Sequence, residues 1–201
     1  MSSLVIEPMQ IPTYLDFPES IRFSRENFVE ICQRNPDRHL EQEANGDITI
    51  RAPSGSETGR RNACATAALV NWAENHGGVV LDSSAGFRLP NGATRAPDAA
   101  WISDEKWQAV PPEEREGFAA LTPDFVIEIV SPADTLSKQI AKMEEYAVNG
   151  VSLGWLIIPK SKEVRIFRPE APTPECVCEA DSIVADDMVL PGFVLDLRRI
   201  W

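Results

Sequence analysis

The chain has 201 residues, of which 43% are hydrophobic and 25% are charged. This is the composition of a globular protein and excludes fibrous and disordered classes. Its 19 basic and 31 acidic residues give a formal net charge of −12, which argues against tight non-specific binding of DNA because neutralisation of phosphates supplies most of that affinity. The net charge does not exclude a local basic patch or a metal-bridged contact with DNA.

A chain of this length buries a full core without support from disulfides or metals. We therefore expect one domain over residues 1–201, with residues 1–20 as an extended N-terminal arm. No apolar stretch approaches the roughly 20 residues that a membrane-spanning helix needs. The N-terminal segment MSSLVIEPMQ shows no basic region followed by an apolar one, so no secretory signal is visible and we expect a cytoplasmic protein.

The four cysteines and two histidines form neither a CxxC nor an HxxxH motif, so the sequence gives poor support for a zinc site. Only Cys176 and Cys178 lie close together in the chain. On a strand their side chains would point the same way. We expect them to be two small buried hydrophobes with free thiols, as in a reducing compartment.

The first part of the chain carries clear capping and turn signals. We predict a first helix that is capped by Ser24 and runs to about residue 33. A hairpin follows, with arms at 39–44 and 48–52 around the turn Asn45-Gly46-Asp47. A second helix then begins at a capping box from Ser54 to Glu57 and ends at Gly77.

The rest of the chain alternates predicted strands with one long helix. The expected strands are residues 79–82, 86–89, 98–102, 125–130, 155–158 and 163–167, and the acidic stretch 103–121 is an expected loop with a helical turn at 112–116.

Residues 125–130 are nearly all apolar, which is typical of a strand in the middle of a sheet. Ser131 as N-cap, Pro132 at the first helical position and Asp134 in the first turn predict a helix that ends at Asn149. The predicted fold class is α+β with an α/β-like character, in which helices flank a central mixed sheet.

Glu128 is the most informative residue of the central strand. An ionised carboxylate in an apolar strand costs several kcal/mol unless a cation compensates it. Asp124 shares its face of the strand but lies roughly 13 Å away, at about 3.3 Å per residue, which is too far to share a metal. Asp98, at the start of another apolar strand, is the candidate partner. Carboxylates on adjacent strands offer the oxygen ligands that Mg²⁺ or Mn²⁺ prefers.

A lysine is the other requirement for nuclease chemistry. Val130 stands where a D…(D/E)xK nuclease has its lysine, so the lysine must come from the following helix. Lys138 and Lys142 lie one turn apart on a shared helix face. Helical side chains lean toward the N-terminus, so Lys142 can reach back to Glu128, and a later helix start brings it closer. Both lysines stay candidates.

Several distinctive stretches follow one another in a fixed order: GSETGRRN, DSSAGFRLPNGATRAPDAAWI, TPDFVIEIVSPADTLSKQIAKMEEYAVNGVSLGWLIIP and LPGFVLDLRRIW. From about residue 21 to residue 201, the chain resembles the Uma-type family of predicted restriction endonucleases, which is common in cyanobacteria. That family is assigned to the PD-(D/E)XK nuclease-like fold, with the lysine moved from the strand to the following helix. The resemblance implies a restriction-endonuclease-like core.

The resemblance also implies roles for single residues. Asp98 matches the PD motif, Glu128 the acidic position of the E-x-x-S strand, and Lys142, four residues before Tyr146, the displaced lysine. Glu41 matches the acidic position that precedes the family's Gly turn. The chain departs from a standard nuclease in lacking E-x-K.

Other polar residues have structural interpretations beside functional ones. Glu57 competes with Glu41 as the N-terminal acid of the site but also fits a helix cap. Asp134 fits a helix cap, and Asp124 fits a hydrogen-bond acceptor at the start of a strand. Tyr146 fits an aromatic residue at the edge of the core. Arg60 and Arg61 are either contacts to phosphate or a solvated pair.

We therefore expect a Mg²⁺- or Mn²⁺-dependent endonuclease that acts on DNA as a homodimer. Asp98, Glu128 and Glu41 would hold the metal, and Lys142 would orient or deprotonate the attacking water. The alternative is a nuclease-like fold that serves as a non-catalytic binding or assembly module, which the net charge and the missing E-x-K favour. A glycosidase with paired carboxylates ranks third, because no aromatic residues cluster near the acids to stack sugars.

Overall fold

The computed structural model describes residues 23–51, 53–171, 173–185 and 188–201. The predicted arm at 1–20 lies outside the described residues.

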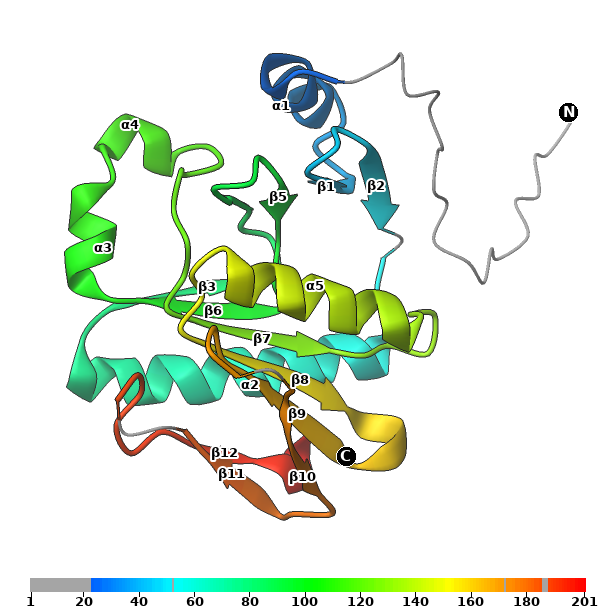
Figure 1. Ribbon diagram of the computed structural model, residues 1–201, viewed down its shortest axis with the longest axis vertical. Helices are drawn as coiled ribbons and strands as arrows, with labels where there is room; N and C mark the ends of the chain where they lie inside the picture. The colour runs from blue at the N-terminus through cyan, green and yellow to red at the C-terminus, as the bar shows by residue number, and fades with distance from the viewer. Residues whose placement is uncertain (1–22, 52, 172, 186–187) are drawn as a thin grey trace, which may run out of the picture.

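A six-stranded sheet in the order β10-β9-β8-β7-β6-β3 forms the centre of the molecule (Figure 1). Its strands are β3 (Val79–Asp82), β6 (Ala99–Ile102), β7 (Phe125–Ile129), β8 (Leu153–Ile158), β9 (Glu163–Phe167) and β10 (Glu175–Cys178). β7 and β8 are parallel, and the other neighbours are antiparallel. β7 is buried along its whole length, which confirms the prediction of a central strand.

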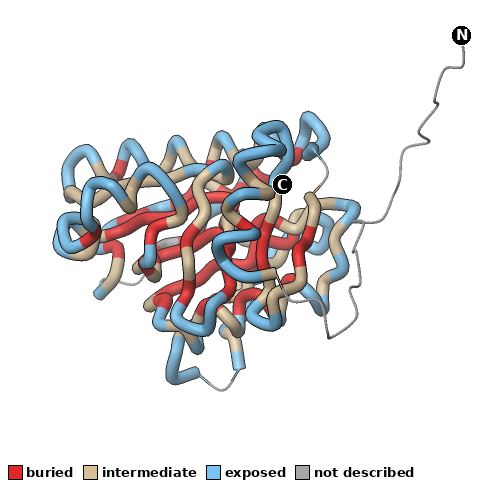
Figure 2. Tube along the Cα trace, turned by 90° about the horizontal axis from the view of Figure 1, so that it is seen from above, coloured by how far each residue is buried: buried red, intermediate tan, exposed pale blue. Residues whose placement is uncertain are grey.

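Two long helices cover opposite faces of this sheet (Figure 1). On one face, α2 (Ser56–His76) packs Leu69 and Trp72 against alternate residues of β7 such as Ile127. On the other face, α5 (Leu136–Val148) packs Met143 and Tyr146 over the remaining positions of the sheet. α5 also supplies the crossover that the parallel β7–β8 pair requires. The buried residues concentrate in the central strands, between the more exposed helices and loops (Figure 2).

A second, four-stranded sheet in the order β2-β1-β5-β4 lies on the α5 side. It consists of β1 (His39–Gln42), β2 (Ile48–Arg51), β4 (Phe87–Arg88) and β5 (Thr94–Arg95). Gly46 has φ 92° in the turn between β1 and β2, a conformation that glycine adopts without steric cost. The predicted hairpin is therefore confirmed.

The remaining elements are short. They are α1 (Arg25–Arg34), α3 (Asp104–Ala109), α4 (Pro112–Arg115), β11 (Ser182–Val184), β12 (Val194–Asp196) and two 3₁₀ turns at Pro159–Ser161 and Leu197–Arg199. The C-terminal segment packs Phe193, Leu195 and Ile200 into the core on the α2 side.

The predicted fold class, a mixed α+β arrangement with helices around a central mixed sheet, is confirmed. Ser24 caps α1 as predicted, since its hydroxyl oxygen accepts from the Asn27 backbone N–H. None of the helices that the structure describes has the length and apolar character needed to span a membrane.

Two helix starts differ from the prediction. α2 is capped by Gly55 without a side-chain bond, so the capping box at Ser54 is wrong. α5 begins at Leu136 instead of next to Ser131. Asp134 accepts from the Ser131 backbone N–H at 2.7 Å, which closes a turn ahead of the helix and delays its start.

Two further predictions are corrected. The expected loop at 103–121 contains α3 as well as the predicted turn α4. Cys176 and Cys178 are free and exposed, so the prediction that they are buried is wrong. They lie on β10, an edge strand, where Val177 packs against the core and its two neighbours face solvent.

Candidate functional site

Glu128 lies on β7, and Asp98 directly precedes the neighbouring strand β6 instead of beginning it as predicted. β6 pairs with β7 so that Ala99 is opposite Ile127, and the same register continued by one residue sets Asp98 opposite Glu128. Both side chains are buried on the face that α5 covers. Burial of two carboxylates side by side is costly unless cations or hydrogen bonds compensate them.

Asp98 is held by two donors. Its Oδ2 accepts from the Ile129 backbone N–H at 2.7 Å, and its Oδ1 accepts from Asn62 Nδ2 at 2.8 Å. Burial and the nearby charge of Glu128 raise the pKa of Asp98 to about 7, against the opposing effects of the Ile129 hydrogen bond and of Lys142. Asp98 therefore lies where a bound cation would relieve repulsion between two carboxylates.

Lys142 supplies the cation that Glu128 requires. Its Nζ lies 2.6 Å from Glu128 Oε1 and 2.9 Å from Glu41 Oε1, and the side chain is 7% exposed. The late start of α5 brings Lys142 level with Glu128, as anticipated. Lys138, the other candidate, lines a cavity beside the site together with Lys142. Tyr146 is fully buried and donates its hydroxyl to Glu128 Oε1 at 3.1 Å.

Glu41 joins this cluster from β1. Its Oε1 also accepts from the Ala96 backbone N–H at 3.1 Å. Burial alone would raise the pKa of Glu41, but the charges of Lys142, Arg51 and Arg95 outweigh it and lower that pKa to about 2. Glu41 is thus a buried, ionised carboxylate.

Glu57, the alternative to Glu41, lies outside the cluster. It is exposed on the first turn of α2 and pairs with Arg60 at 2.6 Å. The structure thus brings four of the sequence-predicted residues together: Glu41, Asp98, Glu128 and Lys142.

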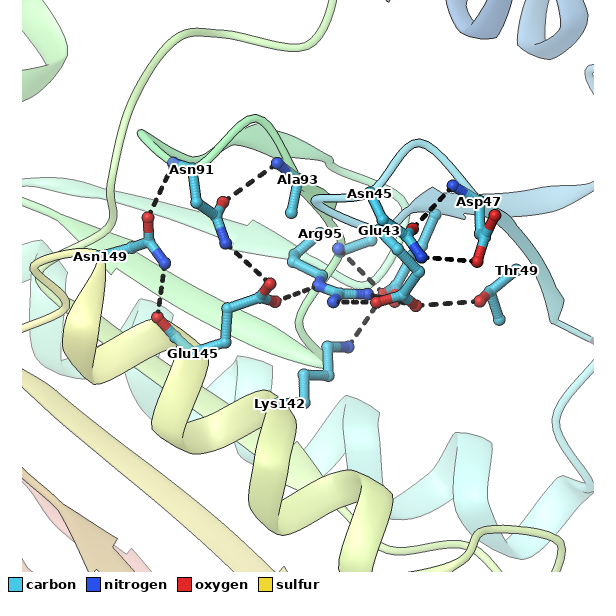
Figure 3. Close-up of polar contacts among 12 residues, drawn as sticks. Glu43, Asn45, Asp47, Thr49, Asn91, Ala93, Arg95, Lys142, Glu145 and Asn149 are labelled. Atoms are coloured by element: carbon cyan, nitrogen blue, oxygen red, sulfur yellow. Dashed lines mark hydrogen bonds and ion pairs between the residues drawn. The ribbon is translucent and has the colours of Figure 1, made fainter. Parts of the chain in front are cut away.

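Arg95 ties the second sheet to α5 (Figure 3). Its Nε lies 2.5 Å from Glu145 Oε2, and its Nη2 lies 2.5 Å from Glu43 Oε2. Asn91 and Thr49 bond the other oxygens of these two carboxylates. Sequence reasoning missed this network, although Arg95 lies three residues before Asp98 in a segment already recognised as distinctive.

Two cavities flank this cluster, and Glu41 and Arg51 line both of them. The larger, of about 420 Å³, is also lined by Lys142, and the smaller, of about 260 Å³, by Asp98. Glu128 lines neither cavity and contacts Lys142 and Tyr146.

The donor chemistry of Asp98 and Glu128 fits a hard cation such as Mg²⁺. Within the described ranges, however, no three His, Cys, Asp or Glu side chains are arranged to hold a metal ion as they stand. Glu41 is tied to Lys142, to Arg95 and to a backbone N–H. Of the three acids, Asp98 and Glu128 are the two that the pairing of β6 with β7 sets opposite each other.

Arg60 and Arg61 do not lie with the lysines. Arg60 Nη1 donates to the carbonyl oxygen of Arg199, and Arg61 Nε donates to that of Ile200, both at 2.6 Å. Both arginines bind the C-terminal segment, and this contact does not support a role in binding phosphate. Asp124 accepts from the Ser103 backbone N–H at 2.8 Å, which confirms its structural role at the start of the strand.

Comparison with known proteins agrees with this fold. The sequence profile of the Uma2 family, described as "Putative restriction endonuclease", matches residues 25–198. A crystal structure from Anabaena variabilis ATCC 29413, described as "a putative nuclease belonging to DUF820", superposes with a TM-score of 0.68 at 18% sequence identity. The match covers 82% of this chain and 90% of the other and shows a shared fold. No curated protein matches the chain.

Proposed function

The chain belongs to the Uma2 family, and from this premise we propose that it is a Mg²⁺- or Mn²⁺-dependent endonuclease that hydrolyses phosphodiester bonds in DNA. One observation carries the proposal: Asp98 and Glu128 are buried side by side next to Lys142. Such a pair is costly in a merely structural role, and a divalent cation would relieve the cost.

Each residue then has a role. Asp98 and Glu128 would hold the cation, which would lower the pKa of a water and stabilise charge on the phosphate. Asn62 and the Ile129 backbone N–H fix the Asp98 carboxylate. A protonated Lys142 has three donors and no acceptor, so we assign to it the orientation of the attacking water. Glu41 keeps Lys142 in the site.

The second candidate is a non-catalytic binding or assembly module. It is favoured by the position of Lys142, which already forms ion pairs with Glu128 and Glu41, and by the net charge of −12. A homodimer and a cytoplasmic location complete the proposal, and light scattering of the purified chain checks the oligomeric state.

The decisive experiment is cleavage of supercoiled plasmid DNA with Mg²⁺, with Mn²⁺ and with EDTA. We expect nicking that requires the metal and that Asp98→Asn and Glu128→Gln each abolish. Glu57→Gln is the matched control, because Glu57 is exposed and outside the cluster, and it should cleave like the parent. Absence of both cleavage and any metal-induced rise in melting temperature would favour the binding module.

A further inference from the structure

Arg51 is a cation of the site that the proposed mechanism does not use. It is the last residue of β2, and its Nε lies 3.6 Å from Glu41 Oε1. Its side chain is 30% exposed, whereas the side chains of Arg95 and Lys142 are each 7% exposed. Arg51 is therefore the most accessible of the three cations that face Glu41.

The three cations also differ in how many of their N–H donors already contact a carboxylate. Arg95 donates to Glu145, to Glu41 and twice to Glu43, and Lys142 is shared between two carboxylates. In the part of the chain that the structure describes, Arg51 makes one long ion pair and donates no hydrogen bond. A guanidinium carries five N–H donors, so this one retains capacity for a ligand.

The position of Arg51 indicates which ligand it can bind. It lines the cavity that Asp98 also lines, so a group that enters there reaches the carboxylate and the guanidinium together. Burial disfavours the charged guanidinium, but the charges of Glu41, Glu128 and Asp98 raise the pKa of Arg51. A planar guanidinium pairs with two phosphate oxygens at once, which a lysine ammonium does not.

We propose that Arg51 contacts the non-bridging oxygens of the scissile phosphate in the proposed nuclease reaction. This inference rests on the proposed function and adds to it a substrate-contacting residue. It also helps an acidic protein to engage a polyanion, because the phosphate meets a partly exposed cation in the same cavity that Asp98 lines. The competing interpretation is a structural ion pair that serves only to neutralise Glu41.

The test compares Arg51→Met and Arg51→Lys with Arg165→Met. Arg165 is the matched control, because its side chain is 27% exposed and pairs with a single acid, Glu163, on β9. Binding of a fluorescent DNA duplex is followed by anisotropy over a range of KCl concentrations, in an Asp98→Asn background that prevents cleavage. The melting temperature of each variant is measured alongside.

Loss of one phosphate contact should weaken binding about tenfold at low salt and flatten the plot of log affinity against log salt by about 0.9. We expect this for Arg51→Met with a melting temperature close to that of the parent, partial recovery in Arg51→Lys, and parental behaviour in Arg165→Met. If the parent binds DNA and the slope of log affinity against log salt is unchanged in Arg51→Met, the proposed role of Arg51 is wrong but the proposed function is not affected. Absence of DNA binding by the parent overturns the proposed function as well.

Discussion

Lys142 stabilises two buried carboxylates at once, and this decides how substitutions at the site act. Its Nζ contacts Glu128 and Glu41, and Tyr146 adds a hydroxyl to Glu128. Removal of a cation from such a cluster leaves uncompensated buried charge, which typically costs 3–5 kcal/mol. Neutralisation of one acid, by contrast, leaves the lysine with a partner.

Glu128→Gln is therefore expected to fold as well as the parent. The amide oxygen of Gln still accepts from Lys142 and Tyr146, and the repulsion between Glu128 and Asp98 disappears. The parent should gain about 1.4 kcal/mol of stability from Mg²⁺ at ten times Kd, which raises its melting temperature by a few degrees, and the variant should lose this gain. Thermal unfolding with and without millimolar Mg²⁺ measures both effects. A variant that melts far below a parent insensitive to Mg²⁺ and Mn²⁺ would make Glu128 a structural charge.

The raised pKa of Asp98 predicts an unusual dependence of the free energy of unfolding on pH. Its carboxyl has a pKa of about 7 in the folded protein and about 3.9 in an unfolded chain. The folded state thus holds this proton more tightly, so the free energy of unfolding falls as pH rises from about 4 to about 7 and then levels off. Between pH 5 and pH 8 the loss is roughly 3 kcal/mol.

Asp98→Asn removes this titration and should flatten the profile. Urea unfolding in EDTA between pH 5 and pH 8 is the measurement, and the difference between parent and variant isolates Asp98 from other titrating groups. Equal slopes in the two proteins would show that the Asp98 carboxyl is ionised across this range.

At the scale of elements, Arg95 joins three pieces of the fold. It lies on β5 and pairs with Glu43, which follows β1, and with Glu145 on α5. Arg95→Met leaves these acids and Glu41 without a shared partner, so we expect a loss of about 3–5 kcal/mol. Arg88→Met, on the adjacent strand β4, is the control and should change stability little. Chemical denaturation of both variants tests the assignment, which equal stabilities would contradict.

The sequence predicted those features of the site that depend on local periodicity. Strand alternation placed Glu128 on one face of its strand, Asp98 was the candidate partner from a second strand, and helix geometry let Lys142 reach Glu128 while Lys138 stayed a candidate. The contacts of Arg51 and Arg95 were missed, because they depend on how the hairpin β1–β2 and the two-residue strand β5 dock beside α5. Such short strands carry no periodic signal. Cys176 and Cys178 were misplaced because nothing in a four-residue strand says that it lies at the edge of a sheet.

At the scale of the whole molecule, which has a net charge of −12, added salt acts in opposite directions on stability and on DNA binding. Screening weakens the self-repulsion of an acidic surface, whereas the buried cluster of Glu41, Glu128 and Lys142 is shielded from salt. Contacts to phosphate lose affinity as salt rises.

A rise in KCl from about 20 mM to about 200 mM should therefore raise the melting temperature by a few degrees while it weakens binding of DNA. Differential scanning fluorimetry and anisotropy on the same samples give the two trends. A melting temperature that falls with salt would mean that exposed ion pairs such as Arg60–Glu57 outweigh the net repulsion. That outcome is unexpected, since isolated surface pairs contribute only about 0–1 kcal/mol each, while self-repulsion acts over the whole acidic surface.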